Sequence, residues 1–182
     1  MECALTIPTS VVNLKLDRTS TWNVCVSGVE IVTHLDVGDG GIKVAGCPKL
    51  RELVWHGGCL SLVTVPCSLR NITALTALTL SIGTIDRAFE FPPALARVVL
   101  KMRANSFDIT RLSVLAHLQE LDVTAKAAPP VDLAGFESLR RLVAFNTPVL
   151  RFPTSLVLCC TALSRDIDFS ALTRLTTLHV KL

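Results

Sequence analysis

Hydrophobic residues recur along this chain in one pattern: an apolar residue, two residues of any type, a second apolar residue, one further residue and a third apolar residue. Clear copies begin at Leu50, Leu75, Leu95, Leu118, Leu139 and Leu175, and weaker copies begin at Val11 and Val32. The copies are about 20 residues apart, a spacing typical of a solenoid in which each unit stacks on the next. The longer gap between Leu139 and Leu175 predicts one degenerate copy around Leu156 and Leu158.

The last two apolar positions of each copy are separated by one residue, as in a β-strand with one buried face. A second pattern precedes three of the copies: a short stretch of polar residues followed by apolar ones. The stretches begin at Asp108, Asp132 and Asp168. A carboxylate at such a position can accept the free backbone N–H groups of a helical turn. The sequence therefore predicts a strand, a loop and a capped short helix in each unit.

With these repeats the chain resembles the leucine-rich-repeat proteins, especially the short-period type of internalins and intracellular phosphatase regulators, from about Val11 to Leu182. The resemblance implies an α/β solenoid, a curved stack with a parallel concave sheet, irregular convex loops and short helices. We expect residues 1–182 to form a single domain of about eight or nine repeats, with degenerate N-terminal copies and an open C-terminal end. Such repeats usually carry Asn or Cys nine residues into the unit. Here that position holds Gly58, Gly83, Arg103, Lys126 and Thr147, which predicts irregular turns.

Composition limits the compartment and the partner. Half of the residues are hydrophobic, yet no apolar run reaches the roughly 18 residues that a membrane span needs, and the N-terminus lacks the pattern of a signal peptide. Seven cysteines without a C-x-x-C motif are typical of buried thiols in a reducing compartment, which predicts an intracellular protein, cytoplasmic or nuclear. A net charge of +3 is well below the clustered positive charge that is typical of a nucleic-acid-binding surface.

Period-two alternation places the residues between the core positions on the concave face of the sheet. We expect eleven of these residues to contact a partner: Lys15, Asp36, Glu52, His56, Arg97, Lys101, Glu120, Asp122, Arg141, Phe145 and His179. Arg97, Glu120 and Arg141 should form one row of alternating charge, which is either a recognition stripe or a set of exposed ion pairs of low energy. Phe145, flanked by Val143 and Val99, is the candidate aromatic anchor.

The sequence offers little for catalysis, metals or cofactors. His34, Asp36, Glu52 and His56 fall on two adjacent strands, but their spacing matches no known metal site, and cross-strand pairing is enough to explain them. The adjacent thiols of Cys159 and Cys160 should point to opposite faces, and Trp22 and Trp55 are expected in the core. Because no phosphate-binding, dinucleotide, esterase or zinc-protease motif is present, we expect no enzyme activity, no cofactor and no metal.

The function that these features favour is a non-catalytic protein–protein interaction module, a scaffold subunit of a multiprotein assembly that binds through the concave face and the open ends. The alternative is a substrate-recruiting or regulatory adaptor of the phosphatase or ubiquitin-ligase type. A subunit that contacts nucleic acid is the third interpretation, and it would use basic residues of the concave face: Lys15, Arg97, Lys101, Arg141 and Lys181.

Overall fold

The computed structural model describes thirteen segments of the chain. They are residues 2–4, 7–17, 23–27, 30–38, 42–45, 47–56, 69–82, 85, 89–102, 108–125, 130–145, 147–162 and 169–181. Trp22, Asp168, Gly58, Gly83, Arg103 and Lys126, singled out above, lie outside them.

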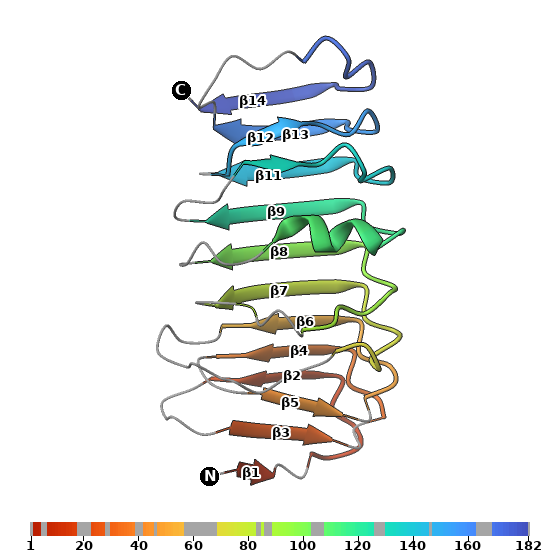
Figure 1. Cartoon of the computed structure of the whole chain (residues 1–182). Helices are drawn as coiled ribbons and strands as arrows, with labels where there is room; N and C mark the ends of the chain where they lie inside the picture. The colour runs from red at the N-terminus through yellow and green to blue at the C-terminus, as the bar shows by residue number, and fades with distance from the viewer. Residues whose placement is uncertain are drawn as a thin grey trace.

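A nine-stranded parallel sheet runs along the molecule, and each predicted repeat supplies one strand (Figure 1). Its strands are β2 (Asn13–Leu16), β4 (His34–Val37), β6 (Glu52–Trp55), β7 (Ala77–Ile82), β8 (Arg97–Met102), β9 (Glu120–Ala125), β11 (Arg141–Phe145), β13 (Leu158–Ala162) and β14 (Thr177–Lys181). Neighbours in this series are hydrogen-bonded throughout, so the sheet forms one continuous wall. The predicted solenoid with a parallel sheet is confirmed.

Hydrophobic side chains at alternate strand positions form the core, as the alternation predicts. The second inward residue of each repeat lies in one row across the strands, and seven members of that row are at most 1% exposed: Leu35, Leu53, Leu78, Val98, Leu121, Leu142 and Cys159. Trp55, predicted to lie in the core, occupies the next inward row and is 7% exposed. Apolar area removed from water in this way is the main favourable term in folding.

Backbone hydrogen bonds hold the coils in register just before each strand begins. The amide of Thr33 donates to the carbonyl of Val12, and the amide of Arg51 donates to that of Thr33. The same bond recurs, at 2.8 or 2.9 Å, up to the last strand through Thr76, Ala96, Gln119, Arg140, Val157 and Thr176. Each unit is therefore fixed to its neighbours by the same contact, as expected for a stack of repeats.

Tight turns precede the strands where the sequence predicted short helices. The amide of Leu139 donates to the carbonyl of Phe136, whose own amide donates to Leu133, and each partner lies three residues upstream. All three side chains are buried, because a three-residue spacing returns each one to the core. Within the described segments, η1 (Ile109–Val114), a 3-10 helix, is the one helical element.

Asp108 caps η1 as predicted, whereas Asp132 accepts a backbone amide as predicted but is not followed by the predicted helix. Asp108 Oδ1 accepts the amide of Thr110 at 3.0 Å. Asp132 also accepts a local amide, that of Ala134 at 3.0 Å, but it ends a short strand and pairs with Arg151 of a neighbouring coil. The carboxylate satisfies the same kind of N–H group at both sites, and only the first site continues into a helix.

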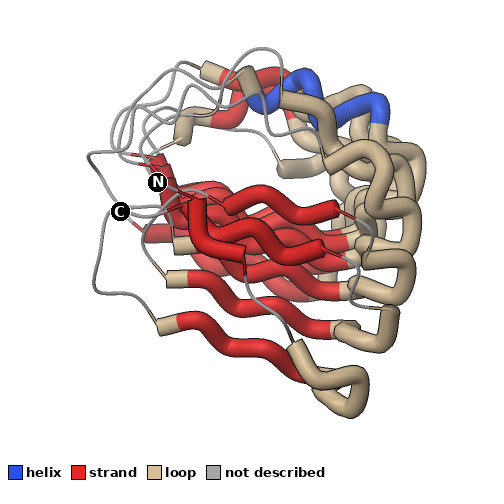
Figure 2. The backbone as a smooth tube through the Cα atoms, turned by 90° about the horizontal axis from the view of Figure 1, so that it is seen from below, coloured by secondary structure: helices blue, strands red, loops and turns tan. Residues whose placement is uncertain are grey.

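Extended segments cover much of the convex side. β1 (Glu2–Ala4), β3 (Asn23–Ser27) and β5 (Ile42–Ala45) form a parallel sheet of their own, and β10 (Val131–Asp132) pairs with β12 (Val149–Arg151). Seen along the solenoid in Figure 2, the large sheet is one wall, and the short strands and η1 lie on the opposite side. The N-terminal coils therefore alternate between a strand of the large sheet and a convex strand.

Hydroxyl groups link consecutive coils near the start of the strands. Ser155 Oγ donates to the carbonyl of Leu139 at 2.6 Å, and Thr76 Oγ1 donates to that of Arg51 at 3.3 Å. Thr147, at a position where related repeats carry Asn, is 3% exposed, and its Oγ1 lies 3.5 Å from the carbonyl oxygen of Phe145. Ser155 and Thr76 therefore link consecutive coils, whereas Thr147 bonds within its own coil.

The degenerate repeat begins at Leu156 but continues differently from the prediction. Leu156 is fully buried, as a first position should be, and Cys159 and Thr161 then take the two inward strand positions. Leu158 is only half-buried, because it lies one residue before the inward position. No helix in the described part of the chain is long and apolar enough to cross a membrane.

Candidate functional site

The outward side of the nine-stranded sheet, called the open face below, carries the residues that the alternation assigned to it. The registers place them in rows that cross the strands. In the central strands β8, β9 and β11, three rows of three positions form a grid. The rows are Arg97, Glu120 and Arg141; Val99, Asp122 and Val143; and Lys101, Thr124 and Phe145.

The first row is the predicted ladder of alternating charge. Glu120 Oε2 lies 3.6 Å from Arg97 Nε and 3.6 Å from Arg141 Nη1. All three side chains are about half exposed, so each pair contributes at most about 1 kcal/mol to stability. The single carboxylate of Glu120 offsets one of the two positive charges in this row.

Asp122, at the centre of the grid, is in a less favourable environment. Its neighbours in the row, Val99 and Val143, are each 8% exposed, and burial raises the pKa of the Asp122 carboxyl above its ordinary value. The positive charges of Arg141 and Lys101, followed by Arg97, lower that pKa in part. Within the described part of the chain, the carboxylate makes no hydrogen bond or ion pair. It is therefore partly desolvated without a direct partner.

The predicted aromatic anchor is less prominent than expected. Phe145 lies on the open face but is only partly exposed, and the two valines that were expected beside it on the surface are buried. The valines occupy the middle row, between two rows of mostly longer side chains that limit the access of water. The position of Val99 and Val143 was predicted correctly, but their exposure was not.

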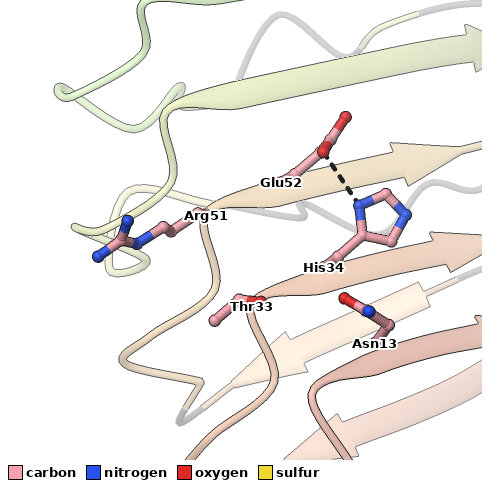
Figure 3. Close-up of a pocket in the computed structure, with 5 residues that line it drawn as sticks. All are labelled: Asn13, Thr33, His34, Arg51 and Glu52. Carbon is pink, nitrogen blue, oxygen red and sulfur yellow. Dashed lines mark hydrogen bonds and ion pairs between the residues drawn. The ribbon is translucent and has the colours of Figure 1, made fainter.

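Histidines and carboxylates pair across the N-terminal strands. His34 Nδ1 lies 3.0 Å from Glu52 Oε2, and Figure 3 shows the two side chains pointing toward each other from β4 and β6. They line an open depression of about 570 Å³, together with Asn13, Thr33 and Arg51.

Asp36 lies in the next row and has two partners. His56 Nε2 is 3.7 Å from Asp36 Oδ1, and Lys15 Nζ is 4.0 Å from Asp36 Oδ2. Lys15 also lies 3.4 Å from Asp17. Among the residues that the structure describes, no three His, Cys, Asp or Glu side chains are placed to hold a metal ion. Pairwise cross-strand contacts account for this cluster.

The C-terminal strands carry the remaining predicted residues. His179 and Lys181 are exposed on β14, and Cys160 lies between Val143 and His179 in the second row. Cys159 points into the core and Cys160 to the open face, as predicted. Leu178 is 41% exposed and Leu14 is only half-buried, whereas their counterparts in the strands between β2 and β14 are buried, because β2 and β14 are the edge strands of the sheet.

The structure thus brings six of the eleven predicted residues into the central grid and four into the N-terminal cluster. Phe145 lies at a corner of the grid, and His179, the eleventh residue, lies on β14. The charged residues of the grid that were predicted are Arg97, Lys101, Glu120, Asp122 and Arg141. The N-terminal cluster contains Lys15, Asp36, Glu52 and His56. Sequence reasoning missed the desolvation of Asp122. The available signal was the pair of valines at the same strand position in the two neighbouring repeats.

The solenoid is similar to a solved structure of an internalin from Listeria monocytogenes, with a TM-score of 0.51 and 14% sequence identity. The match covers 94% of this chain and 61% of the internalin, so the chain spans less than two thirds of that protein's length. No protein-family model matches the sequence, and no curated protein matches it. Repeats, parallel sheet and structural similarity together establish that this chain has the leucine-rich-repeat fold.

Proposed function

We propose that the chain is a non-catalytic protein-interaction module and that its partner binds across the open face of β8, β9 and β11. The observation that carries this proposal is the position of Asp122. This carboxylate is held between two buried valines and has no direct partner among the described residues, an arrangement that costs stability in the isolated chain. A cationic side chain of a partner would remove that cost, and buried charged contacts of this kind often dominate the energy of an interface.

The surroundings of Asp122 favour a protein partner over a nucleic acid. Arg97 and Arg141 both contact Glu120, and Lys15 contacts two aspartates, so the basic residues of this face alternate with carboxylates. Phosphate groups in a regular array would meet these carboxylates and be repelled. Mixed charge around an apolar centre is typical of the surface that a folded protein recognises.

Within this proposal we favour a scaffold subunit of a larger assembly, contained in one domain and located in a reducing intracellular compartment. A transient regulatory adaptor remains the second candidate, because the same open face would serve it.

Affinity capture from native extract tests the proposal. The bait is the full chain, and the open-face variant combines Arg141→Glu with Phe145→Ser. The control is Leu150→Ser, a 53% exposed residue of the convex strand β12. We expect a partner protein to be recovered with the unmodified chain and the control and lost with the open-face variant. Equal recovery with all three baits would contradict the proposal. Partner proteins recovered at a constant stoichiometry would identify a scaffold subunit. Variable partner proteins recovered in substoichiometric amounts would identify an adaptor.

A further inference from the structure

The charged side chains of the open-face grid are not all paired with one another. Glu120 lies between Arg97 and Arg141 and contacts both. Lys101 is exposed and, like Asp122, forms no ion pair with any residue that the structure describes. Three positive charges against two negative charges leave the grid with a net charge of +1. The grid therefore presents one free ammonium group and one free carboxylate to a partner.

A purely basic partner is a poor match for this arrangement. Burial raises the pKa of Asp122, and the positive charges of Arg141 and Lys101 lower it in part. Both charges therefore act on the space around this carboxylate. A basic side chain that approached Asp122 alone would be repelled by both of them. An acidic side chain placed beside Lys101 would remove one of these repulsions and would give the free ammonium group a partner.

The positions of these groups set the spacing that a partner must match. Lys101, Asp122 and Arg141 lie on one diagonal of the grid, on the adjacent strands β8, β9 and β11 (Figure 1). Strands lie about 4.8 Å apart and residues on one face of a strand about 6.6 Å apart, so neighbours on the diagonal are about 8 Å apart. Glu120 is shared between two arginines, so the guanidinium of Arg141 keeps N–H donors for a second carboxylate. The charges along the diagonal are thus positive, negative and positive.

We propose that the partner contributes an extended segment in which three alternate side chains are acidic, basic and acidic, an inference that rests on the proposed function. The basic side chain pairs with Asp122, and the two acidic side chains pair with Lys101 and Arg141. Alternate side chains of an extended segment lie about 6.6 Å apart on one face. This distance is closer to the diagonal spacing than the roughly 5–6 Å between residues one turn apart in a helix. The long, flexible stems of lysine and arginine close the remaining gap.

Titration of the ¹⁵N-labelled full chain with two isomeric peptides, followed by NMR at low salt, tests the inference. In N-acetyl-Glu-Thr-Arg-Thr-Glu-amide, the three charged side chains share one face of an extended chain. In N-acetyl-Glu-Arg-Thr-Thr-Glu-amide, the basic side chain lies on the opposite face from the acidic ones. We expect the first peptide to cause saturable shifts confined to residues 97–101, 120–124 and 141–145. The isomer should bind roughly fivefold more weakly, as for the loss of one exposed ion pair.

Charge reversal at Lys101 provides the matched variant. Lys101→Glu should weaken binding of the first peptide by about fivefold and should strengthen binding of N-acetyl-Arg-Thr-Arg-Thr-Glu-amide. The fold should stay intact because this side chain is exposed. Lys49→Glu makes the same change at an exposed residue outside the grid and should leave the affinities for both peptides unchanged. Absence of saturable shifts, equal affinity for the two isomers, or equal effects of the two variants would overturn the inference.

Failure of this inference is distinguishable from failure of the proposed function, which the capture experiment tests. If the two isomers bind equally while the open-face variant still loses its partner protein, the partner reaches the grid with other chemistry and only the inference fails. If all three baits recover the same proteins equally, the proposed function itself fails, and the inference fails with it.

Discussion

Glu120 Oε2 lies 3.6 Å from Arg141 Nη1, and the two residues face each other directly in the register of β9 and β11. The carboxylate lies equally close to Arg97 on its other side. Because all three side chains are substantially exposed, water and salt weaken these attractions. The ladder therefore contributes more to the pattern of charge on the open face than to the stability of the fold.

Replacing Glu120 by glutamine should lower the free energy of unfolding by no more than about 2 kcal/mol, since two exposed pairs are lost. The loss should shrink as salt is added. Urea denaturation followed by circular dichroism measures it. Glu137→Gln is the matched control, because Glu137 is exposed and forms no ion pair within the described segments. A loss well above that limit, or one that salt does not change, would show that the ladder is structural.

Replacing Asp122 by asparagine should stabilise the chain at neutral pH. Burial raises the pKa of Asp122 in the folded state above its ordinary value of 3.8, so the ionised form disfavours folding. Protonated Asp122 favours the folded state more than ionised Asp122 does. This contribution to stability is present below pH 3.8 and is lost as the pH rises through the folded-state pKa.

The gain in the free energy of unfolding from Asp122→Asn should therefore be present at pH 7. It should be absent at pH 3, where Asp122 is protonated in both the folded and the unfolded state. Urea denaturation at the two pH values measures it, with Glu137→Gln again as the control for the loss of one negative charge. If the asparagine variant is less stable than the parent at pH 7, the carboxylate is satisfied in the isolated chain, and the main argument for a partner at this position fails.

Cys159 and Cys160 should differ sharply in reactivity although they are adjacent. Cys159 is fully buried, and burial, together with the neighbouring Cys160, raises the pKa of its thiol to about 11. Since the thiolate is the reactive form, iodoacetamide at pH 8 should modify Cys160 first and reach Cys159 only after unfolding. Peptide mass spectrometry with time resolves the two sites. Equal rates in the folded chain would contradict the assigned alternation of β13.

Asp108→Ala should destabilise the region of η1 by about 0.5–2 kcal/mol, because the amide of Thr110 loses its acceptor. Asp108→Asn should retain most of the stability, since its side-chain oxygen can accept the same bond. Hydrogen exchange of residues 109–115 measures the local effect. An alanine variant with unchanged exchange would show that this cap does not hold the turn.

The large sheet could be predicted from the sequence because its information is local and repeated. An apolar residue at every second strand position determines which face of the strand is buried. The residues on either side of Leu121 were therefore assigned correctly to the open face. The degenerate repeat was harder, because Cys159 and Thr161 replace the usual aliphatic residues at the inward positions. Leu156 was the useful signal, and the small buried thiol was the clue that went unused.

The convex side was predictable only in part. A carboxylate before an apolar stretch marks a turn that needs an N–H acceptor, and this held for Asp108 and Asp132 alike. Whether a helix follows depends on packing against the next coil, which for Asp132 takes the form of strand pairing with Arg151. The exposure of Val99 and Val143 likewise depended on side chains from other repeats, which no local pattern contains.

Site-specific photocrosslinking in native extract tests the central claim most directly. A photoreactive phenylalanine analogue replaces Phe145 on the open face in one chain and Leu150 on the convex strand β12 in another. If a partner protein covers the grid around Asp122, the first chain should form a discrete crosslinked product that the second does not. A product formed equally from both positions, or from Leu150 alone, would contradict binding across the open face.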